Sequence, residues 1–306
     1  MRELEIIEWI RTRRLAGAKN GVVRVGPGDD CAVLADPGRG YELLLKTDGL
    51  VEGLHFDRGA RPVEVGYKAV ARALSDVAAC GGEPLGAVVF AALNRRHTGN
   101  WTRAFQRGLE KVAQRYSCPV VGGDVSGTSG PTTIATGLLG KVRKGRALLR
   151  NGARSGDRVF VTGRLGGSIL GRHLRFAPRL DEGLFLGRFK GVGACIDVSD
   201  GLTRDLAHIL KESGGLGAEL DASAVPVSGA ARKQEGDTLE HALSDGEDYE
   251  LLFTVRPARA GALRKKWRFK TKLTEIGGIL PRGKGTWLVS EAGKRRRLKP
   301  AGWQHL

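Results

Sequence analysis

Two adjacent carboxylates near the start of the chain give the first chemical signal. Asp29 and Asp30 follow a Gly-Pro-Gly sequence, and a third acid, Asp48, comes after a short apolar stretch. Adjacent like charges are costly unless a positive group neutralises them. A magnesium ion that carries a nucleotide would supply that positive charge, and we take this as the working hypothesis.

Further acids lie beside glycine or directly after apolar segments, where a ligand should stand if the backbone must approach a phosphate closely. Hard oxygen ligands of this kind suit magnesium, which binds through a few carboxylates and through substrate phosphates. Solvated acids in surface turns are the alternative, because the sequence alone does not bring them together. The full set is Asp29, Asp30, Asp48, Asp76, Asp124, Asp197, Asp200, Glu247 and Asp248.

Other catalytic arrangements are missing from the sequence. The chain has no G-x-x-x-x-G-K-[ST] loop, no H-R-D or D-F-G motif of protein kinases, no H-E-x-x-H zinc motif and no G-x-S-x-G elbow. A nucleotide enzyme of this sequence would therefore replace the P-loop lysine with metal ions. No C-x-x-C pair occurs, so we expect free, buried thiols at Cys31, Cys80, Cys118 and Cys195.

The elements that would position these acids alternate along the N-terminal half. We expect the strand before Asp48 to run into a Thr-Asp-Gly turn, and Asp124 to lie on a glycine turn. Asp76 lies in the last turns of a predicted helix, where the helix dipole disfavours an anion, so it needs a cationic partner. Apolar spacing predicts helices over 3–15, 62–82 and 100–116. It predicts a strand within 41–50 that runs into the turn at 47–49, and strands over 85–93 and 132–142.

A polar, glycine-bearing stretch at 150–157 separates two apolar strands and predicts domains at 1–149 and 150–306. The later elements are a helix over 168–176, a strand, turn and helix over 194–210 with Ser199 or Asp200 as N-cap, and an acidic turn that feeds a strand over 244–255. A helix over 258–268 and two strands, LTEIGGIL and TWLVS, follow. This alternation indicates an α/β or α+β fold in both halves.

The formal net charge of the 306 residues is +17, and most of it lies near the end. From Leu251 to Leu306 there are fifteen Lys and Arg residues and two acids. The run GKRRRLKP at 293–300 is typical of a solvated turn or strand end, with attraction of RNA or another acidic ligand as the alternative. No apolar run of about 18 residues and no signal-like start occur, so we expect a soluble, cytoplasmic protein with no membrane partner.

Seven motifs occur together in one order along the chain. They are GPGDDCAVL, TDGLVEGLHF, GYKAVARALSDVAACGGEP, VVGGD, GRALLRNGARSGDRVFVTG, IDVSDGL with DLAHI, and GEDYELLFTV. In order and approximate spacing the chain resembles the thiamine-monophosphate kinase family, from about residue 3 to its end. The wider group includes aminoimidazole ribonucleotide synthetase, selenophosphate synthetase and a hydrogenase maturation protein, and the motifs LVEGLHF and GEDYELLFTV favour the thiamine branch.

The resemblance implies a two-domain fold like that of aminoimidazole ribonucleotide synthetase. The sheet of its N-terminal α/β domain would pair with a second subunit to form a barrel, and ATP would lie between this domain and a C-terminal α/β domain. The resemblance further implies a homodimer that uses ATP and Mg²⁺ and transfers the γ-phosphoryl group directly to thiamine monophosphate, giving thiamine diphosphate.

The same resemblance assigns roles to individual residues. Asp48, Asp124 and Asp200 would be catalytic. Gly123, Asp124, Arg150 and Ser199 would contact ATP, while His55, Glu247 and Trp303 would contact thiamine monophosphate. Surface or packing roles for Arg150, His55 and Trp303 are the alternatives. The metal ligands would be Asp30, Thr47, Asp48, Asp76, Asp124, Asp197 and Asp200.

Three departures from the family pattern leave alternatives open. Lys46 stands where serine is common, and its charge could replace one metal ion or point away along the strand. Asp245 stands where glycine is common and adds negative charge near the acceptor pocket, and the chain ends in Gln-His-Leu rather than an aromatic pair. A related ATP-dependent enzyme acting on another small metabolite is therefore the second hypothesis, and nucleic-acid binding by the basic C-terminal segment is the third.

Overall fold

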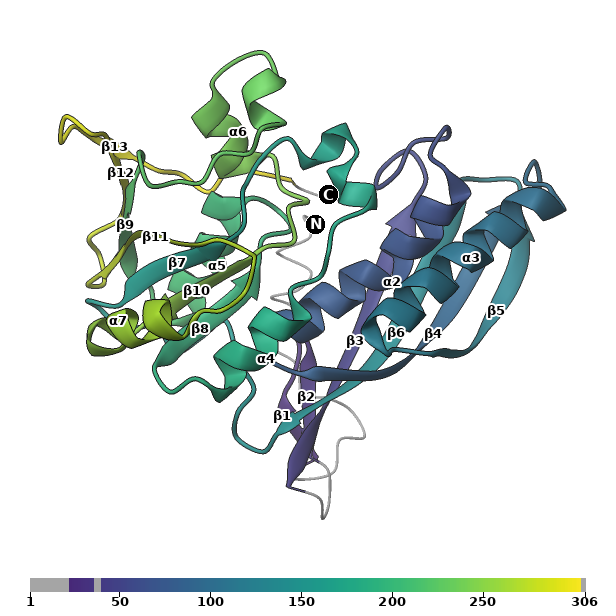
Figure 1. Ribbon diagram of the computed structural model, residues 1–306, viewed down its shortest axis with the longest axis horizontal. Coiled ribbons are helices and arrows are strands. Elements are labelled where there is room, and N and C mark those ends of the chain that lie inside the picture. The colour runs from purple at the N-terminus through teal and green to yellow at the C-terminus, as the bar shows by residue number, and fades with distance from the viewer. Residues whose placement is uncertain (1–21, 36–39, 304–306) are drawn as a thin grey trace.

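Two β-sheets with helices packed around them form the framework of the chain (Figure 1). The computed structural model describes residues 22–35 and 40–303. The helix predicted over 3–15 lies outside these ranges. The mixed α/β architecture predicted from the sequence is confirmed in both halves, and each sheet is open in the part of the chain described.

The first sheet has six strands and is covered on one face by two long helices. Figure 1 shows α2 (Pro62–Ala79) and α3 (Gly99–Tyr116) side by side across that face. Helix α2 begins with proline at its first position and ends just before Gly81, which has a positive φ of 69°. The strand order is β1 (Val23–Val25), β2 (Ala32–Ala35), β3 (Tyr41–Val51), β6 (Thr133–Arg143), β4 (Glu83–Asn94) and β5 (Val120–Thr128).

The opposite face of the first sheet is apolar and exposed. Along β3, Leu44 is fully buried under the helices, while the next residue, Leu45, is 47% exposed on the other side. Strand pairing places Leu139 beside Leu45, and Val88 and Phe90 of β4 are on the same side. We call this row of exposed apolar side chains the open face.

The second sheet is covered on both faces. Val159 and Val161 of β7 pack with α5 (Leu202–Glu212) on one side, while Phe160 packs toward α4 (Leu180–Arg188) and α7 (Pro257–Lys266) on the other. The strand order is β13 (Arg295–Arg297), β12 (Thr286–Val289), β9 (Gly217–Asp221), β11 (Leu273–Leu280), β7 (Arg158–Thr162), β10 (Leu251–Val255) and β8 (Val192–Asp197).

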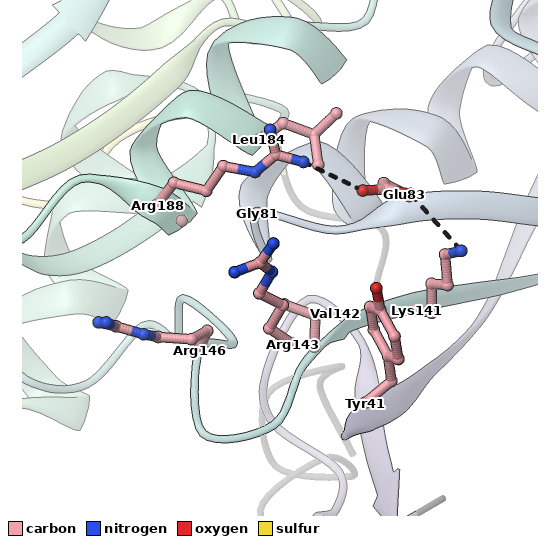
Figure 2. A pocket seen from close by; sticks show the side chains of 10 residues that line it. Tyr41, Gly81, Glu83, Lys141, Val142, Arg143, Arg146, Leu184 and Arg188 are labelled. Atoms are coloured by element: carbon pink, nitrogen blue, oxygen red, sulfur yellow. Dashed lines mark hydrogen bonds and ion pairs between the residues drawn. The ribbon is translucent and has the colours of Figure 1, made fainter. Parts of the chain in front are cut away.

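Helix α4 connects the two halves by packing on α2. Gly183 lies so close to α2 that an added Cβ would be 2.1 Å from the carbonyl oxygen of Ala78. Figure 2 shows Arg188 of α4 and Lys141 of β6 converging on Glu83, at 3.3 Å and 3.7 Å. The boundary after residue 149 falls in the connection between β6 and β7, and we keep it as a proposal because this packing crosses it.

Several local predictions are wrong. Strand β3 continues through Thr47, Asp48 and Gly49, because each of them pairs with β6, and β5 continues through Asp124, which pairs with Phe90 of β4. Inter-strand pairing overrides the turn preference of these glycine-rich sequences. The helix predicted over 168–176 is two short 3₁₀ turns, Ser168–Leu170 and Arg172–Leu174. Helix α4, helix α6 (Thr238–Ser244) and strand β9 were not predicted.

The four cysteines are free and buried, as predicted. Phe105 and Leu109 of α3 are core residues, so the apolar side of the predicted helix packs against the protein interior. Among the described helices, none has the length together with the apolar character that crossing a bilayer requires.

Candidate active site

Charged side chains of α2 and β3 face each other across the covered side of the first sheet. Lys68, Arg72 and Asp76 are four residues apart on α2, so they share one face of the helix. Lys46 and Asp48 are two residues apart on β3, so they point to the same side. The Lys46 ammonium lies 2.9 Å from Asp76 Oδ1, and Arg72 Nη2 lies 3.3 Å from Asp48 Oδ1. The cationic partner that the sequence required for Asp76 is therefore Lys46.

Three buried carboxylates from distant parts of the sequence meet next to this pair. Asp30 lies in the turn before β2, Asp76 lies on α2, and Asp197 ends β8 of the second sheet. One ligand oxygen from each can be chosen so that all three lie within 4.8 Å of one another. The Ser75 hydroxyl donates to Asp197 at 2.6 Å. We call Asp30, Asp76 and Asp197 the acid cluster.

Arg150, in the connection between the sheets, and Asp29, in the turn before β2, support the acid cluster. The Arg150 guanidinium donates to Asp30 Oδ1 through Nη2 at 2.6 Å and through Nε at 3.2 Å. Asp29 does not join the cluster, because its carboxylate accepts the backbone N–H groups of Asp30 at 3.0 Å and Arg150 at 3.2 Å. Asp29 thus fixes the turn that presents Asp30.

The acid cluster is electrostatically incomplete. Burial and the nearby Asp30 charge raise the pKa of Asp197 to about 7, and burial also raises the pKa of Asp76 although Lys46 opposes the shift. Asp30 Oδ2 is buried and has no hydrogen-bond partner. A buried carboxylate oxygen without a donor is costly, and a divalent cation with oxygen preference fits that position.

Two acidic turns pack against each other beside the acid cluster. The sequence 199–201 and the sequence 244–246 are both Ser-Asp-Gly, and the backbone N–H of Glu247 donates to the Ser199 carbonyl at 2.7 Å. A Cβ on Gly246 would lie 2.7 Å from that same carbonyl oxygen, so this contact requires glycine. The C-terminal segment joins here, since the Trp303 N–H donates to the Asp200 carbonyl at 3.0 Å.

Asp200 has two possible companions as a ligand, Asp205 and His208 of α5, with ligand atoms within 4.8 Å. Asp205 already accepts the backbone N–H groups of Asp200 and Gly201, both at 3.1 Å. The N-cap prediction is therefore wrong: the N-cap residue is Gly201, and Asp205 satisfies the free N–H groups from inside the helix.

Two residues assigned to thiamine monophosphate, His55 and Glu247, are brought together by a lysine. The buried Lys68 ammonium donates to the His55 carbonyl at 2.7 Å and pairs with Glu247. Burial lowers the pKa of Lys68 to about 8, although Glu247 opposes the shift. His55 Nδ1 accepts the Val51 N–H at 3.0 Å, and Trp303 is 41% exposed at the edge of this region.

Three residues that the resemblance assigned to the site lie away from the acid cluster: Thr47, Gly123 and Asp124. Thr47 alternates with Lys46 and Asp48 along β3, so its side chain is on the open face, and pairing with Phe90 puts Asp124 on that face too. Strands β6 and β4 separate Asp124 from β3. Gly123 is explained by close strand packing, because a Cβ there would lie 2.0 Å from the Val89 carbonyl oxygen.

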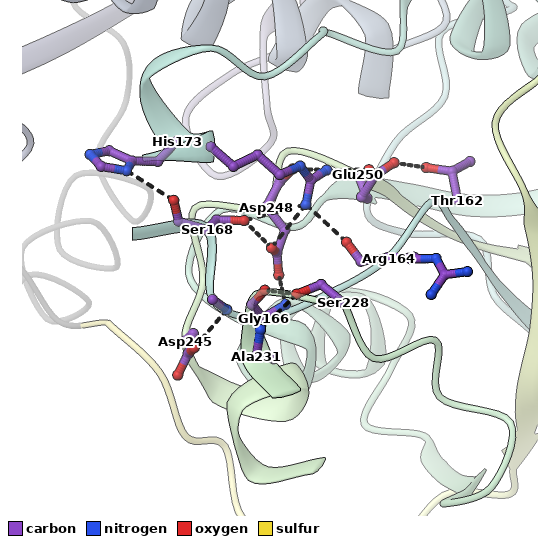
Figure 3. Close-up of polar contacts among 12 residues, drawn as sticks. Thr162, Arg164, Gly166, Ser168, His173, Ser228, Ala231, Asp245, Asp248 and Glu250 are labelled. Atoms are coloured by element: carbon purple, nitrogen blue, oxygen red, sulfur yellow. Dashed lines mark hydrogen bonds and ion pairs between the residues drawn. The ribbon is translucent and has the colours of Figure 1, made fainter. Parts of the chain in front are cut away.

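Asp248 and Asp245 form a different polar network, built around the glycine loop that follows β7 (Figure 3). Asp248 accepts the Gly166 N–H at 2.9 Å and the Ser168 hydroxyl, so it lies outside the acid cluster. Asp245 accepts the Gly167 N–H at 2.8 Å and contacts His241 Nδ1 at 2.9 Å. The extra charge expected near the acceptor pocket is thus held by the glycine loop after β7 and by His241 of α6.

Sequence analysis missed the buried cations and the hydroxyl that hold these acids. Lys68, Arg72 and Ser75 belong to one of the seven motifs, yet none was assigned a role. A signal was present, because two cations and an acid at four-residue spacing on an otherwise apolar helix need buried partners. Glu250, which contacts Arg172 and Arg179, was missed because it reads as part of an apolar strand.

Several known proteins are similar to the chain in sequence. Residues 28–142 match the family described as AIR synthase related protein, N-terminal domain. Thiamine-monophosphate kinase of Rhodopirellula baltica is 38% identical over 306 residues, covering 96% of this chain and 94% of that protein. The protein of the same name from Salmonella typhimurium is 40% identical over 265 residues, covering 79% of each chain.

A solved structure described as AaThiL complexed with AMPPCP and TMP has a TM-score of 0.83 and 31% sequence identity to the chain. The match covers 100% of this chain and 97% of that one. The fold, the ordered motifs and the identity over nearly the full length agree. The chain belongs to the thiamine-monophosphate kinase family.

Proposed function

We propose that the chain transfers the γ-phosphoryl group of ATP to the phosphate of thiamine monophosphate, using Mg²⁺, in the cytoplasm. The observation that carries the proposal is the convergence of Asp30, Asp76 and Asp197, whose ligand atoms lie within 4.8 Å although the residues are far apart in sequence. Family membership supports the choice of substrates, since a solved relative was described with AMPPCP and TMP.

The residues present fit magnesium. Asp30 and Asp197 offer buried carboxylate oxygens, and Asp30 Oδ2 has no other partner. Asp48 and Asp200 flank the acid cluster and would hold ions nearer the phosphates. Bound magnesium would neutralise the phosphate oxygens of ATP and stabilise the charge of the transferred group.

Direct transfer requires an oxygen of the acceptor phosphate to attack the γ-phosphorus while the bond to the leaving ADP oxygen breaks. The protein positions both anions and needs no nucleophile of its own. Arg150 and Ser199 would contact ATP from the connection between the sheets and from the 199–201 turn. A planar guanidinium held by Asp30 can still donate its outer N–H groups to a phosphate.

The acceptor side is formed by His55, Glu247 and Trp303. Lys68 contacts both His55 and Glu247. Arg72 pairs with Asp48, which lies between these residues and the acid cluster. The exposed Trp303 ring offers a flat surface on which the thiamine rings can stack. These roles rest on the resemblance, and the clustering of the side chains supports them.

Asp124, Gly123 and Thr47 enter the proposal through a second copy of the chain. Asp124 is three strands away from β3, about 14 Å at the usual strand spacing, and faces away from the acid cluster. The apolar open face around it is a surface that a homodimer would bury. We infer that Asp124 of one chain serves ATP together with the acid cluster of the other.

The test is a turnover assay with ATP, Mg²⁺ and thiamine monophosphate, in which thiamine diphosphate is separated by chromatography. Formation of thiamine diphosphate with loss of one ATP per product is expected. A folded protein that forms none would overturn the proposal. Calorimetric binding of other phosphorylated metabolites in the presence of an ATP analogue then tests the second hypothesis, because thiamine monophosphate should bind most tightly.

A further inference from the structure

Lys46 lies inside the metal-binding region rather than along its edge. Alternation along β3 turns its side chain toward α2, and its ammonium contacts Asp76 Oδ1 at 2.9 Å. The side chain is 23% exposed, while that of Asp76 is 8% exposed. Of the two orientations that the sequence left open, the structure has the one in which the Lys46 ammonium points toward Asp76.

The cations of the chain already neutralise most of the acid cluster. Lys46 pairs with Asp76, Arg150 pairs with Asp30, and the Ser75 hydroxyl donates to Asp197. Three carboxylates therefore face two fixed positive charges. The charge that remains, together with the unpartnered Asp30 Oδ2, calls for a single divalent ion.

Lys46 and a metal ion cannot use the same oxygen of Asp76 at once. Magnesium needs its ligand oxygens at about 2.0–2.1 Å, closer than an ammonium hydrogen bond permits. The ion pair between Lys46 and Asp76 therefore occupies the oxygen that a metal ion would need.

We propose that Lys46 is a resident cation that takes the place of one divalent ion at Asp76, so that the acid cluster binds one metal ion instead of two. The inference rests on the metal-dependent function proposed above. It predicts that the number of bound ions is set by residue 46, and that removing the lysine charge opens a second position at Asp76.

The test counts bound Mn²⁺ by electron paramagnetic resonance. The sharp signal of the free ion in solution is lost when the ion binds, so the bound amount follows by difference. The full chain without nucleotide is titrated with Mn²⁺, and Lys46→Ser is expected to bind one more ion per chain than the unaltered protein. Lys141→Ser is the matched control, because it removes one positive charge from β6, where Lys141 contacts Glu83 at 3.7 Å. It should bind as many ions as the unaltered protein.

Thermal unfolding gives a second readout. In EDTA, Lys46→Ser should melt at a lower temperature than the unaltered protein and recover on addition of Mg²⁺, because the ion restores the charge at Asp76. Lys46→Met keeps the length of the side chain without its charge, and it serves if the serine variant does not fold. It should also gain one ion.

Equal ion counts for the unaltered protein, Lys46→Ser and Lys46→Met would overturn the inference, and so would a loss of Mn²⁺ binding in the folded variants. Neither count depends on turnover. A protein that gains an ion yet makes no thiamine diphosphate would contradict the proposed function alone, and one that makes thiamine diphosphate with unchanged counts would contradict the role of Lys46 alone.

Discussion

The acid cluster and the pair formed by Asp248 and Glu250 are equally buried, but they are neutralised differently. Asp30, Asp76 and Asp197 are 2%, 6% and 3% exposed, and Asp248 and Glu250 are 1% and 0% exposed. In the pair, each carboxylate oxygen has a partner within the chain. The acid cluster leaves Asp30 Oδ2 without one.

The partners of Glu250 neutralise its carboxylate completely. Arg179 donates to both of its oxygens, at 2.6 Å and 2.7 Å, Thr162 donates at 2.7 Å, and Arg172 forms a further ion pair. Such a carboxylate has no free lone pair in a suitable direction for a metal ion. Burial alone therefore does not indicate a metal site, whereas a buried carboxylate oxygen with no donor, beside further carboxylates, does.

Replacing Asp197 by Asn should have the largest effect on activity. The amide keeps the size of the carboxylate and can still accept from Ser75, but it removes one negative charge from the proposed metal site. We expect turnover to fall on the order of 100- to 1000-fold in the kinase assay. The melting temperature without metal should stay the same or rise, because a buried like charge is lost.

An exposed acid provides the comparison for that substitution. Asp181→Asn lies in the first turn of α4 and should keep full activity. Turnover of Asp197→Asn within a few-fold of the unaltered protein would mean that the acid cluster holds no catalytic ion, and the contrast with the Asp248 and Glu250 pair would fail.

Glu250→Gln should have the opposite outcome. Removing this charge leaves Arg179 without its ion-pair partner and Arg172 with Asp248 alone, so the free energy of unfolding should fall by about 3–5 kcal/mol. Urea denaturation followed by fluorescence measures this value. Glu110→Gln, on the exposed side of α3, should change it by less than about 0.5 kcal/mol.

The folded fraction of Glu250→Gln should still bind Mn²⁺ like the unaltered protein. A variant of normal stability that had lost its metal would reverse the assignment of the two sites. It would place the ion at the second site and give the acid cluster the structural role.

The sequence predicted the elements that local pattern determines. Helices α2 and α3 and strands β4 and β6 follow from apolar spacing, and the need of Asp76 for a cation follows from the helix dipole. The identity of that cation did not follow, because Lys46 reaches Asp76 only when β3 packs beneath α2. A contact between elements 30 residues apart cannot be predicted from the local sequence pattern of either element.

The different directions of the Glu247 and Asp248 side chains could not be predicted from the sequence either. Glu247 and Tyr249 have left-handed backbone, with φ of 56° and 52°, so neighbouring side chains in this turn leave in different directions. Glu247 meets Lys68, whereas Asp248 turns into the glycine loop. Position in an acidic motif therefore predicted only one of the two acids near the site.

The smallest expected difference between the acid cluster and the pair formed by Asp248 and Glu250 is in the pH dependence of metal binding. Burial raises the pKa of both Asp197 and Asp248 to about 7 from 3.8, so both carboxyls contribute most to stability below about pH 4 and lose that contribution as the pH rises through 7. In the proposed site, Mg²⁺ would bind only the ionised form of Asp197. Its affinity should therefore be about tenfold weaker at pH 6 than at pH 8.

The measurement is the rise in melting temperature with Mg²⁺ concentration at pH 6 and pH 8. Asp30 raises the pKa of Asp197 further, while Ser75, Lys46 and Arg150 lower it, so the midpoint belongs to the whole acid cluster. Asp248→Asn should leave the pH effect unchanged, since Asp248 faces Ser168 and Gly166 instead of a metal ion. If Asp248→Asn removed the pH effect and Asp197→Asn kept it, the proton displaced by the metal ion would come from the glycine loop, and the two carboxylates would have to exchange roles.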